Sequence, residues 1–236
     1  MKIKSIIFVV ATFIIFLAGC EKDNYKAPDS FLTGTLNYQG TPVPLRSNGV
    51  QIELWQHGFQ LFTSKIPVWV DQNGQYSTQI FDGDYKMTLV KGNGPWVDKT
   101  DSIDVKVKGN TVVDFPVEPF ILLKDVVYTK SGSAPSQTVT VTFSIRYVNT
   151  SKALSTTKLF LSTTAILDNN TNLAALEKKV GTTAGLIPPG ATSATIGPLT
   201  IPASLATKPF IYARVGAQAV GVTEYVYSDA VKITLP

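Results

Sequence analysis

The residues that could support catalysis are few. The only histidine, His57, stands in the stretch Gln56-His57-Gly58, with no evident acid arranged near it. A Ser-His-Asp set needs a histidine that an acid orients, and a zinc site needs several His or Cys ligands. The chain has one histidine and one cysteine. We therefore interpret His57 as an exposed loop residue and predict no catalytic residue, no metal site and no cofactor.

Carboxylates are the remaining route to an enzyme. Asp82 and Asp84 flank Gly83, and Asp71 lies in a predicted hairpin nearby. A glycosidase needs two carboxylates that face each other across a cleft, whereas aspartate at a tight turn commonly bonds its own backbone. Turn chemistry is favoured for all three residues. A calcium-binding loop stays open as an alternative because oxygen-rich loops bind this ion, although EF-hand spacing is missing.

The single cysteine, Cys20, ends the stretch Leu17-Ala18-Gly19-Cys20. Lys2 and Lys4 precede an apolar run from Ile6 to Leu17, which is the layout of a secretory signal. The run is too short for a membrane-spanning helix, which needs about 20 apolar residues. Leu-Ala-Gly-Cys resembles the lipobox of bacterial lipoproteins. This resemblance implies that residues 1–19 are removed and that a lipid on Cys20 anchors the mature protein to a membrane that it does not cross.

The residues after the cysteine bear on location. Glu21, Lys22 and Asp23 resemble the acidic, lysine-containing export signal of surface lipoproteins in Bacteroidetes. The resemblance implies a lipid-anchored protein on the outer membrane, facing the cell exterior. The alternative is that residues 20–29 serve only as a solvated, lipidated tether.

Charge and composition exclude some partners. Without its signal the chain keeps 19 basic and 17 acidic residues, a net charge of about +2. Nucleic-acid binding favours a concentrated basic patch, and no run of like charges is present, so we predict no nucleic-acid partner. Thr, Val, Ser, Gly and Pro are prominent, which is typical of a β-rich protein.

Alternating apolar and polar residues recur from residue 31 onward and predict short strands. Seven strands are expected before residue 118, with turn signals at Asn73-Gly74, Asp82-Gly83 and Gly109-Asn110. Closely spaced strands without helices between them indicate an antiparallel sandwich. We expect a first sandwich over residues 30–118 and a second over residues 119–236. Residues 172–180 are the one predicted helix, and Val139 to Tyr147 give the clearest strand.

Several turn motifs of the first unit support a family resemblance. They are Asn48-Gly49-Val50-Gln51-Ile52, Asp71-Gln-Asn-Gly74, Phe81-Asp-Gly-Asp-Tyr85, Gly94-Pro95-Trp96 and Asp114-Phe115-Pro-Val117. The chain resembles a domain family of unknown function, numbered 3823, from Bacteroidetes lipoproteins that look like companions of starch-utilisation-type outer-membrane machinery. The resemblance implies a transthyretin-like sandwich, similar to the regulatory domains of carboxypeptidases, and no catalytic residues. It also implies an outer-membrane transporter complex as a partner.

The second unit resembles a different sandwich. Ile211-Tyr-Ala-Arg-Val-Gly-Ala217, followed by Val231-Lys-Ile-Thr-Leu235, is similar to the last two strands of fibronectin type III domains. Ile211 stands where that family places its corner tyrosine. The resemblance implies an all-β, immunoglobulin-like second domain.

The tryptophans are the candidate ligand contacts. Strand alternation places Trp55 and Trp69 opposite the apolar faces of their strands, and Trp96 follows a glycine-rich loop. Exposed aromatic rings suit the C–H faces of sugars, although packing under a loop or against the second domain is the alternative. We therefore expect a non-catalytic surface lipoprotein that helps to capture or import a polysaccharide or oligosaccharide. The competing hypothesis is a structural module that spaces or docks an outer-membrane partner, since exposed sheet edges pair with partner strands.

Overall fold

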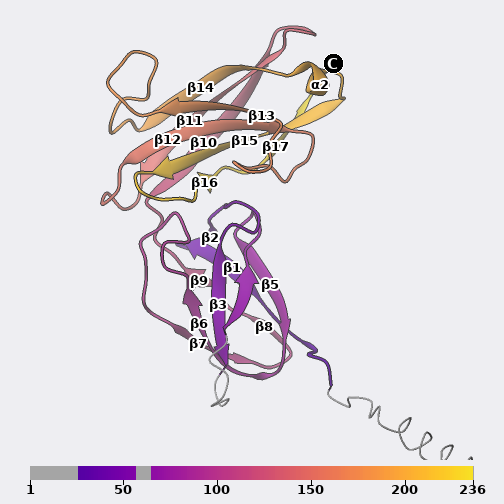
Figure 1. Cartoon of the computed structure of the whole chain (residues 1–236), viewed down its shortest axis with the longest axis vertical. Helices are drawn as coiled ribbons and strands as arrows, with labels where there is room; N and C mark the ends of the chain where they lie inside the picture. The colour runs from indigo at the N-terminus through magenta and orange to yellow at the C-terminus, as the bar shows by residue number, and fades with distance from the viewer. Residues whose placement is uncertain (1–25, 57–64, 236) are drawn as a thin grey trace, which may run out of the picture.

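The chain folds into two all-β domains that lie end to end (Figure 1). The computed structural model describes residues 26–56 and 65–235. Within these residues, no helix is both long and apolar enough to span a membrane. The domain that contains β1 to β9 lies at one end, and the domain that contains β10 to β17 lies at the other.

The N-terminal domain is a sandwich of two sheets, as the transthyretin-like prediction requires. The first sheet is organised around β1, which pairs with every other strand in it: β1 (Ser30–Tyr38), β2 (Thr41–Pro42), β5 (Gln75–Ile80), β8 (Asn110–Val112) and β9 (Phe115–Pro116). The second sheet has four antiparallel strands in the order β4 (Ile66–Trp69), β3 (Gln51–Gln56), β6 (Gly83–Leu89) and β7 (Ile103–Val107).

Strand alternation explains how the two sheets form one core. Leu32 and Leu36 of β1, Ile52 and Leu54 of β3, and Met87 of β6 have no exposed surface. Their polar neighbours along each strand face outward, because successive side chains of a strand point to opposite faces. The predicted strands of this unit are therefore confirmed. The last predicted strand, at Val113 to Val117, is reduced to β9, and β8 lies just before it; both pair in parallel with different parts of β1.

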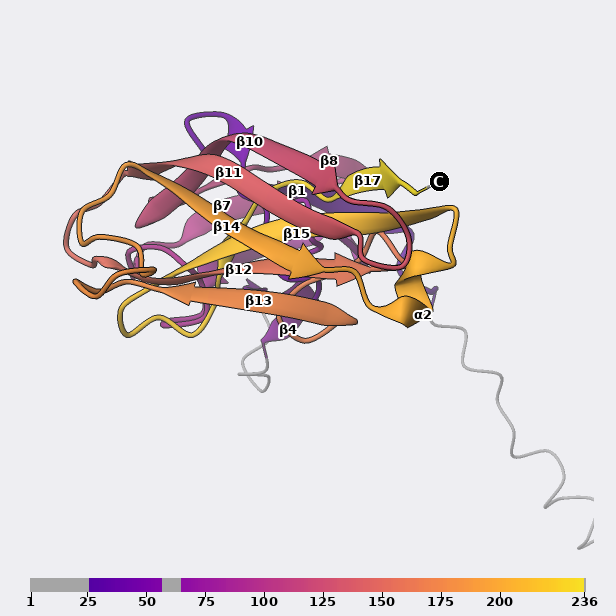
Figure 2. The same ribbon diagram turned by 90° about the horizontal axis from the view of Figure 1, so that it is seen from above.

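The C-terminal domain is also a two-layer sandwich (Figure 2). One layer holds β10 (Ile121–Ser131), β11 (Thr138–Tyr147) and β14 (Ser193–Thr200). The other holds β13 (Ala174–Lys179), β12 (Leu154–Ser162), β15 (Phe210–Ala219), β16 (Val226–Tyr227) and β17 (Val231–Thr234). The short helix α2 (Ala203–Ala206) connects β14 to β15. This arrangement confirms the predicted immunoglobulin-like fold.

The predicted helix over residues 172–180 was wrong. Residues Ala174–Lys179 form strand β13, which pairs antiparallel with β12 at the edge of its sheet. Alanine, leucine, glutamate and lysine all favour helices, but such propensity is weak and tertiary pairing overrides it. Leu176 is half-buried while Glu177 is exposed, which is the two-residue period of a strand.

The two domains are joined by a polar contact around Arg214 of β15. The Arg214 side chain is 1% exposed. Its Nη2 donates to the main-chain oxygen of Gln72 in the other domain at 2.9 Å, its Nη1 to the Leu167 oxygen at 3.1 Å, and its Nε to the Ser228 oxygen at 2.8 Å. The guanidinium also stacks 4.4 Å from the centre of the Tyr227 ring.

A second set of contacts closes the same junction. The Arg46 Nη2 and Nε donate to the two carboxylate oxygens of Glu224 at 2.6 and 3.1 Å. The Tyr227 amide donates to the Pro44 oxygen at 3.1 Å. Both interactions link a loop before β3 to the end of the second domain. The relative position of the domains is thus set by directional hydrogen bonds as well as by packing. Where the chain can be cut into two folding units remains a prediction.

Candidate functional site

A hollow of about 510 Å³ lies over the outer face of β1 and β5. Thr33 and Thr35 of β1 and Gln75 and Ser77 of β5 line it. These residues face outward because Leu32, Leu36, Tyr76 and Ile80, which alternate with them, fill the core. Thr33 pairs with Ser77 and Thr35 with Gln75, so two rows of short polar side chains form the surface of the sheet here.

Trp69 provides the aromatic side of this hollow. It is the last residue of β4, and its side chain is 49% exposed. Val68 and Val70 on either side are 3% and 0% exposed, so the alternation of the strand directs the indole outward. Because β4 leads directly into β5, the ring lies at the margin between the two sheets, beside the polar rows of β1 and β5.

Two carboxylates border the hollow. Asp71 Oδ1 accepts hydrogen bonds from the amides of Asn73 and Gln75, both at 2.8 Å, and so closes the turn before β5. Asp114 Oδ1 accepts from the amide and the hydroxyl of Thr35, both at 2.8 Å. In the described part of the chain, no hydrogen bond is made by the second oxygen of either carboxylate. Each can therefore accept a hydrogen bond from a ligand hydroxyl.

The floor of the hollow depends on Gly34. A Cβ built at this position would lie 1.8 Å from the main-chain oxygen of Val113, so only glycine lets the two backbones approach. The Tyr76 hydroxyl donates to that same oxygen. Burial raises the pKa of the Tyr76 hydroxyl well above its usual range, which keeps the donor protonated. The close approach of the two backbones at the floor is accordingly held by the Tyr76 hydroxyl.

The structure separates the three tryptophans that we predicted as ligand contacts. Trp55 is 37% exposed, but it lies on the outer face of β3 and does not line the hollow. Its Nε1 donates to the Thr88 hydroxyl at 3.1 Å. Trp96 is 3% exposed and packs so closely on Gly94 that an added Cβ would lie 2.1 Å from the indole. A sugar cannot stack on this buried ring, and we leave Trp96 out of the site.

Of the remaining predicted residues, Asp82 and Asp84 lie within the described part of the chain, and the others lie outside it. Turn chemistry is confirmed for Asp71, which bonds its own turn, but not for Asp82, whose Oδ1 accepts from the Ser30 hydroxyl and from the Gly109 amide of other segments, the latter at 2.9 Å. Asp84 is exposed and pairs with Lys106 across the sheet. Within residues 26–56 and 65–235, no cluster of three His, Cys, Asp or Glu side chains could hold a metal ion. Cys20, Glu21, Lys22, Asp23 and His57 lie outside the described residues.

Sequence reasoning missed the polar half of the hollow. Asn48, which also lines it, has a left-handed backbone with φ of 54°. Its Asn-Gly pair was visible as a turn motif, as was Asp114, but nothing in the sequence indicates that both lie beside Trp69. Asp114 and Thr35 are separated by 79 residues. The parallel pairing of both β8 and β9 with β1 brings them together.

Comparisons with known proteins extend over nearly all of the described chain. Two family models match: the N-terminal domain of the protein family of unknown function DUF3823 over residues 30–118, and the DUF3823 C-terminal domain of unknown function over residues 125–232. A search of curated proteins gave no significant match.

Several solved structures share both domains. A DUF3823 family protein from Bacteroides ovatus is 34% identical, covering 88% of this chain and 100% of that one, with a TM-score of 0.73. One from Parabacteroides merdae is 30% identical, covering 89% and 100%, with a TM-score of 0.77. A Bacteroides uniformis protein, described as a candidate carbohydrate-binding protein, is 24% identical, covering 88% and 100%, with a TM-score of 0.68. With both domain models matched in order, the chain belongs to the DUF3823 family.

Proposed function

We propose that this protein is a non-catalytic lipoprotein of the outer cell surface that binds carbohydrate at the hollow beside Trp69 and assists glycan capture or uptake. The observation that carries the proposal is the position of Trp69, half-exposed at the edge of a hollow bordered by Asp71, Asp114 and Asn48. The description of the Bacteroides uniformis protein as a candidate carbohydrate-binding protein supports the same ligand class.

The physical basis of the proposal is the mixed character of a sugar ring. Its C–H face is apolar and packs on an aromatic ring, while its hydroxyls at the ring edge need hydrogen-bond partners. Trp69 offers the ring, and the unbonded oxygens of Asp71 and Asp114 offer acceptors. Binding sites of this kind place a few polar groups around an apolar contact surface. The hollow is open and shallow, which suits weak binding of a surface-exposed glycan.

The ligand test uses affinity electrophoresis of the protein without its signal in gels that contain starch, dextran, arabinoxylan, galactomannan, pectin or mucin. We expect at least one of these polysaccharides to retard the protein. Trp69→Ala should then weaken binding by about 1–3 kcal/mol, by analogy with base–aromatic stacking.

Trp55→Ala is the matched control, because it removes an exposed indole outside the hollow. Loss of retardation in Trp55→Ala with normal retardation in Trp69→Ala would move the site to the outer face of β3. If no polysaccharide retards the folded protein, carbohydrate binding is refuted, and a module that docks a protein partner becomes the better hypothesis.

Location needs a separate test. We expect mass spectrometry of the native protein to find a lipid on Cys20, and Cys20→Ser to leave the chain unprocessed. Replacing Glu21, Lys22 and Asp23 with alanine should keep the lipid but protect the protein from protease added to intact cells. An unmodified Cys20, or unchanged protease sensitivity of the triple variant, would contradict the corresponding part of the proposal.

A further inference from the structure

We infer that the ligand of this site is a polymer of neutral sugars that runs from the Trp69 hollow into a cleft between the two domains. This inference rests on the function proposed above and adds the length and charge of the ligand. The interdomain cleft has a volume of about 670 Å³, within the range usual for ligand sites, which also favour domain interfaces.

The hollow and the cleft are continuous. Gln75 lines both of them. Asp71 lines the hollow and Asn73, two residues later in the same turn, lines the cleft. On the neighbouring strand, Thr35 lines the hollow, and Tyr38, about 10 Å further along at ~3.3 Å per residue and on the opposite face of the strand, lines the cleft where the strand ends. Among the described residues, the Gln75 side chain makes no hydrogen bond, so it is available to a ligand that passes over it.

The cleft carries an aromatic ring, as the hollow does, and adds cationic side chains that the hollow lacks. Tyr38 comes from the first domain, and Arg146 and Lys124 come from the second. The Arg146 guanidinium lies 5.9 Å from the centre of the Tyr38 ring, and it has no carboxylate partner within the described chain. Such an arginine can donate up to five hydrogen bonds in a planar arrangement.

The charges in the cleft favour a neutral ligand. Lys124 and Arg146 are matched by Asp125 and Asp229, which line the same cleft. The Trp69 hollow adds Asp71 and Asp114 without any cation among its lining residues. A polyanion such as a uronic-acid polymer would therefore meet uncompensated like charges in the hollow and no net positive charge in the cleft, which disfavours binding. A neutral polysaccharide would use the carboxylates as acceptors and the two cations as donors.

The path is held in a fixed shape by the domain junction. Arg214 bonds the main-chain oxygen of Gln72, inside the turn that separates the hollow from the cleft. The Arg46–Glu224 pair fixes the preceding loop of the same domain against the second domain. Because the two walls of the cleft belong to different domains, these contacts set its width before a ligand arrives. A preformed site avoids part of the entropy cost of binding.

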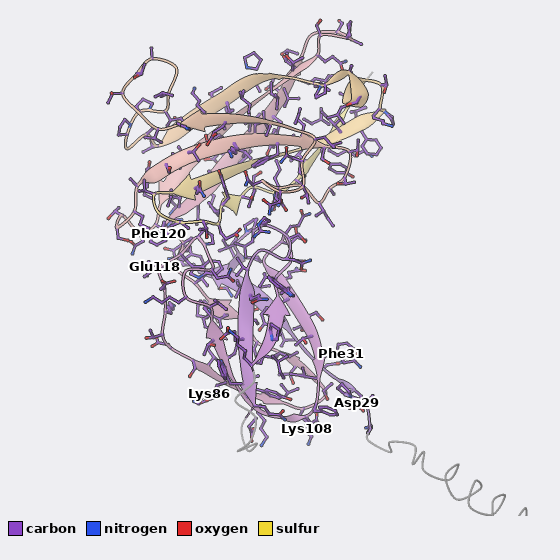
Figure 3. All side chains as sticks on the ribbon, viewed as in Figure 1. Asp29, Phe31, Lys86, Lys108, Glu118 and Phe120 are labelled. Carbon is purple, nitrogen blue, oxygen red and sulfur yellow. The ribbon has the colours of Figure 1, made fainter. Side chains whose placement is uncertain are left out.

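An exposed aromatic ring also lies at the far end of the path. Phe31 is 41% exposed and shares the outward face of β1 with Thr33 and Thr35. Figure 3 places it at the end of the N-terminal domain away from Glu118 and Phe120, which lie at the junction. From Phe31 to Thr35, which lie on the same outward face, strand β1 extends about 13 Å at ~3.3 Å per residue. A single sugar cannot contact both ends of such a path.

The experiment measures affinity as a function of ligand length. The polysaccharide that retards the protein most strongly is cut into fragments of defined size, from disaccharide upward, and each is titrated by calorimetry. We expect affinity to rise with length until the fragment reaches from Trp69 to Tyr38. Tyr38→Ala should then weaken binding of long fragments about tenfold, and Arg146→Ala several-fold, with short fragments unaffected by either.

Controls separate this inference from the proposed function. Lys179→Ala removes an exposed cation from β13, outside the cleft, and should change nothing. Trp69→Ala should weaken short and long fragments alike. If Trp69→Ala weakens binding while affinity is independent of length and neither cleft variant has an effect, the extended path is refuted and the Trp69 site stands. Stronger binding of pectin than of every neutral polysaccharide would refute the neutral ligand. No binding to any polysaccharide would overturn both proposals.

Discussion

Two arginines of the C-terminal domain show how differently the two sides of the domain junction are built. Arg214 is buried, and four hydrogen bonds to main-chain and side-chain oxygens occupy its guanidinium. Arg146 is exposed in the cleft, where its contact is the Tyr38 ring. Both lie on central strands that pair with a neighbour on each side, β15 and β11, so position in the sheet does not explain the contrast.

The two arginines differ in how many hydrogen-bond donors each side chain keeps for solvent or a ligand. A buried donor must be paired, because an unpaired polar group in the interior costs about 1–3 kcal/mol. Arg214 meets that requirement within the protein and so serves the structure. Arg146 keeps most of its donors for solvent or a ligand. The same distinction holds between Trp96, packed on Gly94, and Trp69, exposed beside the hollow.

The largest effect should follow from removing the donors of Arg214. Arg214→Met keeps most of the side-chain length but removes the donor to the oxygens of Leu167 and Ser228, and leaves the Gln72 oxygen with the Leu45 amide as its remaining donor. We expect a loss of about 3–5 kcal/mol in the free energy of unfolding. Arg146→Met is the control and should change stability by less than about 0.5 kcal/mol.

The same variant can test whether the hydrogen bonds at the domain junction couple the stabilities of the two domains. All three tryptophans, Trp55, Trp69 and Trp96, lie in the N-terminal domain, so their fluorescence follows that domain alone, while circular dichroism follows both. Arg214→Met should shift the fluorescence transition in urea although Arg214 belongs to the other domain. An unshifted fluorescence midpoint would show that the bond to Gln72 does not stabilise the N-terminal domain.

A substitution in the floor of the hollow should have the next largest effect. Gly34→Ala forces a Cβ against the main-chain oxygen of Val113, at 1.8 Å before any movement. Overpacking of this kind costs about 1–3 kcal/mol, and the segment between β8 and β9 that carries Val113 must move away from β1. We expect lower stability in urea and weaker glycan retardation together. Gly92→Ala is a poor control because Gly92 has φ of 71°, whereas Gly83→Ala meets nothing closer than 3.5 Å. Unchanged stability in Gly34→Ala would mean that the floor is pliable.

The Arg46–Glu224 pair is less buried than Arg214 and less exposed than Arg146, so breaking it should have an intermediate effect on stability. Its side chains are 23% and 12% exposed, and the pair is joined by two hydrogen bonds. The hydrogen bonds that Arg46 donates to Glu224 raise the pKa of Arg46, so the guanidinium stays charged. A double-mutant cycle with Arg46→Ala and Glu224→Ala should give a coupling energy of about 1–2 kcal/mol. The exposed pair Lys86–Asp104, at 2.8 Å, serves as the reference and should couple by less than about 0.5 kcal/mol. Equal coupling in both pairs would contradict the dependence on burial.

The sequence predicts those features of this protein that depend on residues close together in the chain, and it misses those that depend on residues far apart. Strand alternation is a local signal, and it correctly placed Trp69 outside a core made of residues such as Ile52 and Leu54. It failed at Ala174–Lys179, where helix-favouring residues form an edge strand because β12 offers pairing partners. The loop position of Trp96 did not indicate whether its ring is exposed, because its burial depends on the backbone at Gly94 and on a β-bridge to Pro119.

Local sequence patterns do not predict most of the candidate site. Trp69, Asp114 and Gln75 come from three separate segments, and only the pairing of β1 with both β5 and β8 places them around one hollow. Arg214 and Gln72 are 142 residues apart. No periodicity in either segment indicates that one will bond the other. Strands and their faces were therefore predictable from the sequence, whereas the groups that meet across strands and domains were not.

The smallest effect should come from a carboxylate that is hydrogen-bonded but exposed. Asp82 accepts hydrogen bonds from the Ser30 hydroxyl and the Gly109 amide, and these bonds lower the pKa of its carboxyl group. A lowered pKa means that the unfolded chain binds the proton more readily. Asp82 therefore contributes stability above the usual carboxyl pKa of about 4, and that contribution is lost as the pH falls through the lowered value.

Asp82→Asn should accordingly lower the urea midpoint slightly at pH 7, and the difference from the unmodified protein should narrow as the pH is reduced toward 3. Asp84→Asn is the control, because Asp84 is also an exposed acid of the same turn region and makes no such bonds in the described structure. A difference that stays constant with pH would show that the charge of Asp82 is irrelevant and that only its shape matters. A loss as large as that of Arg214→Met would break the comparison on which these predictions rest, since a polar contact at the surface would then stabilise the fold as strongly as one buried at the junction.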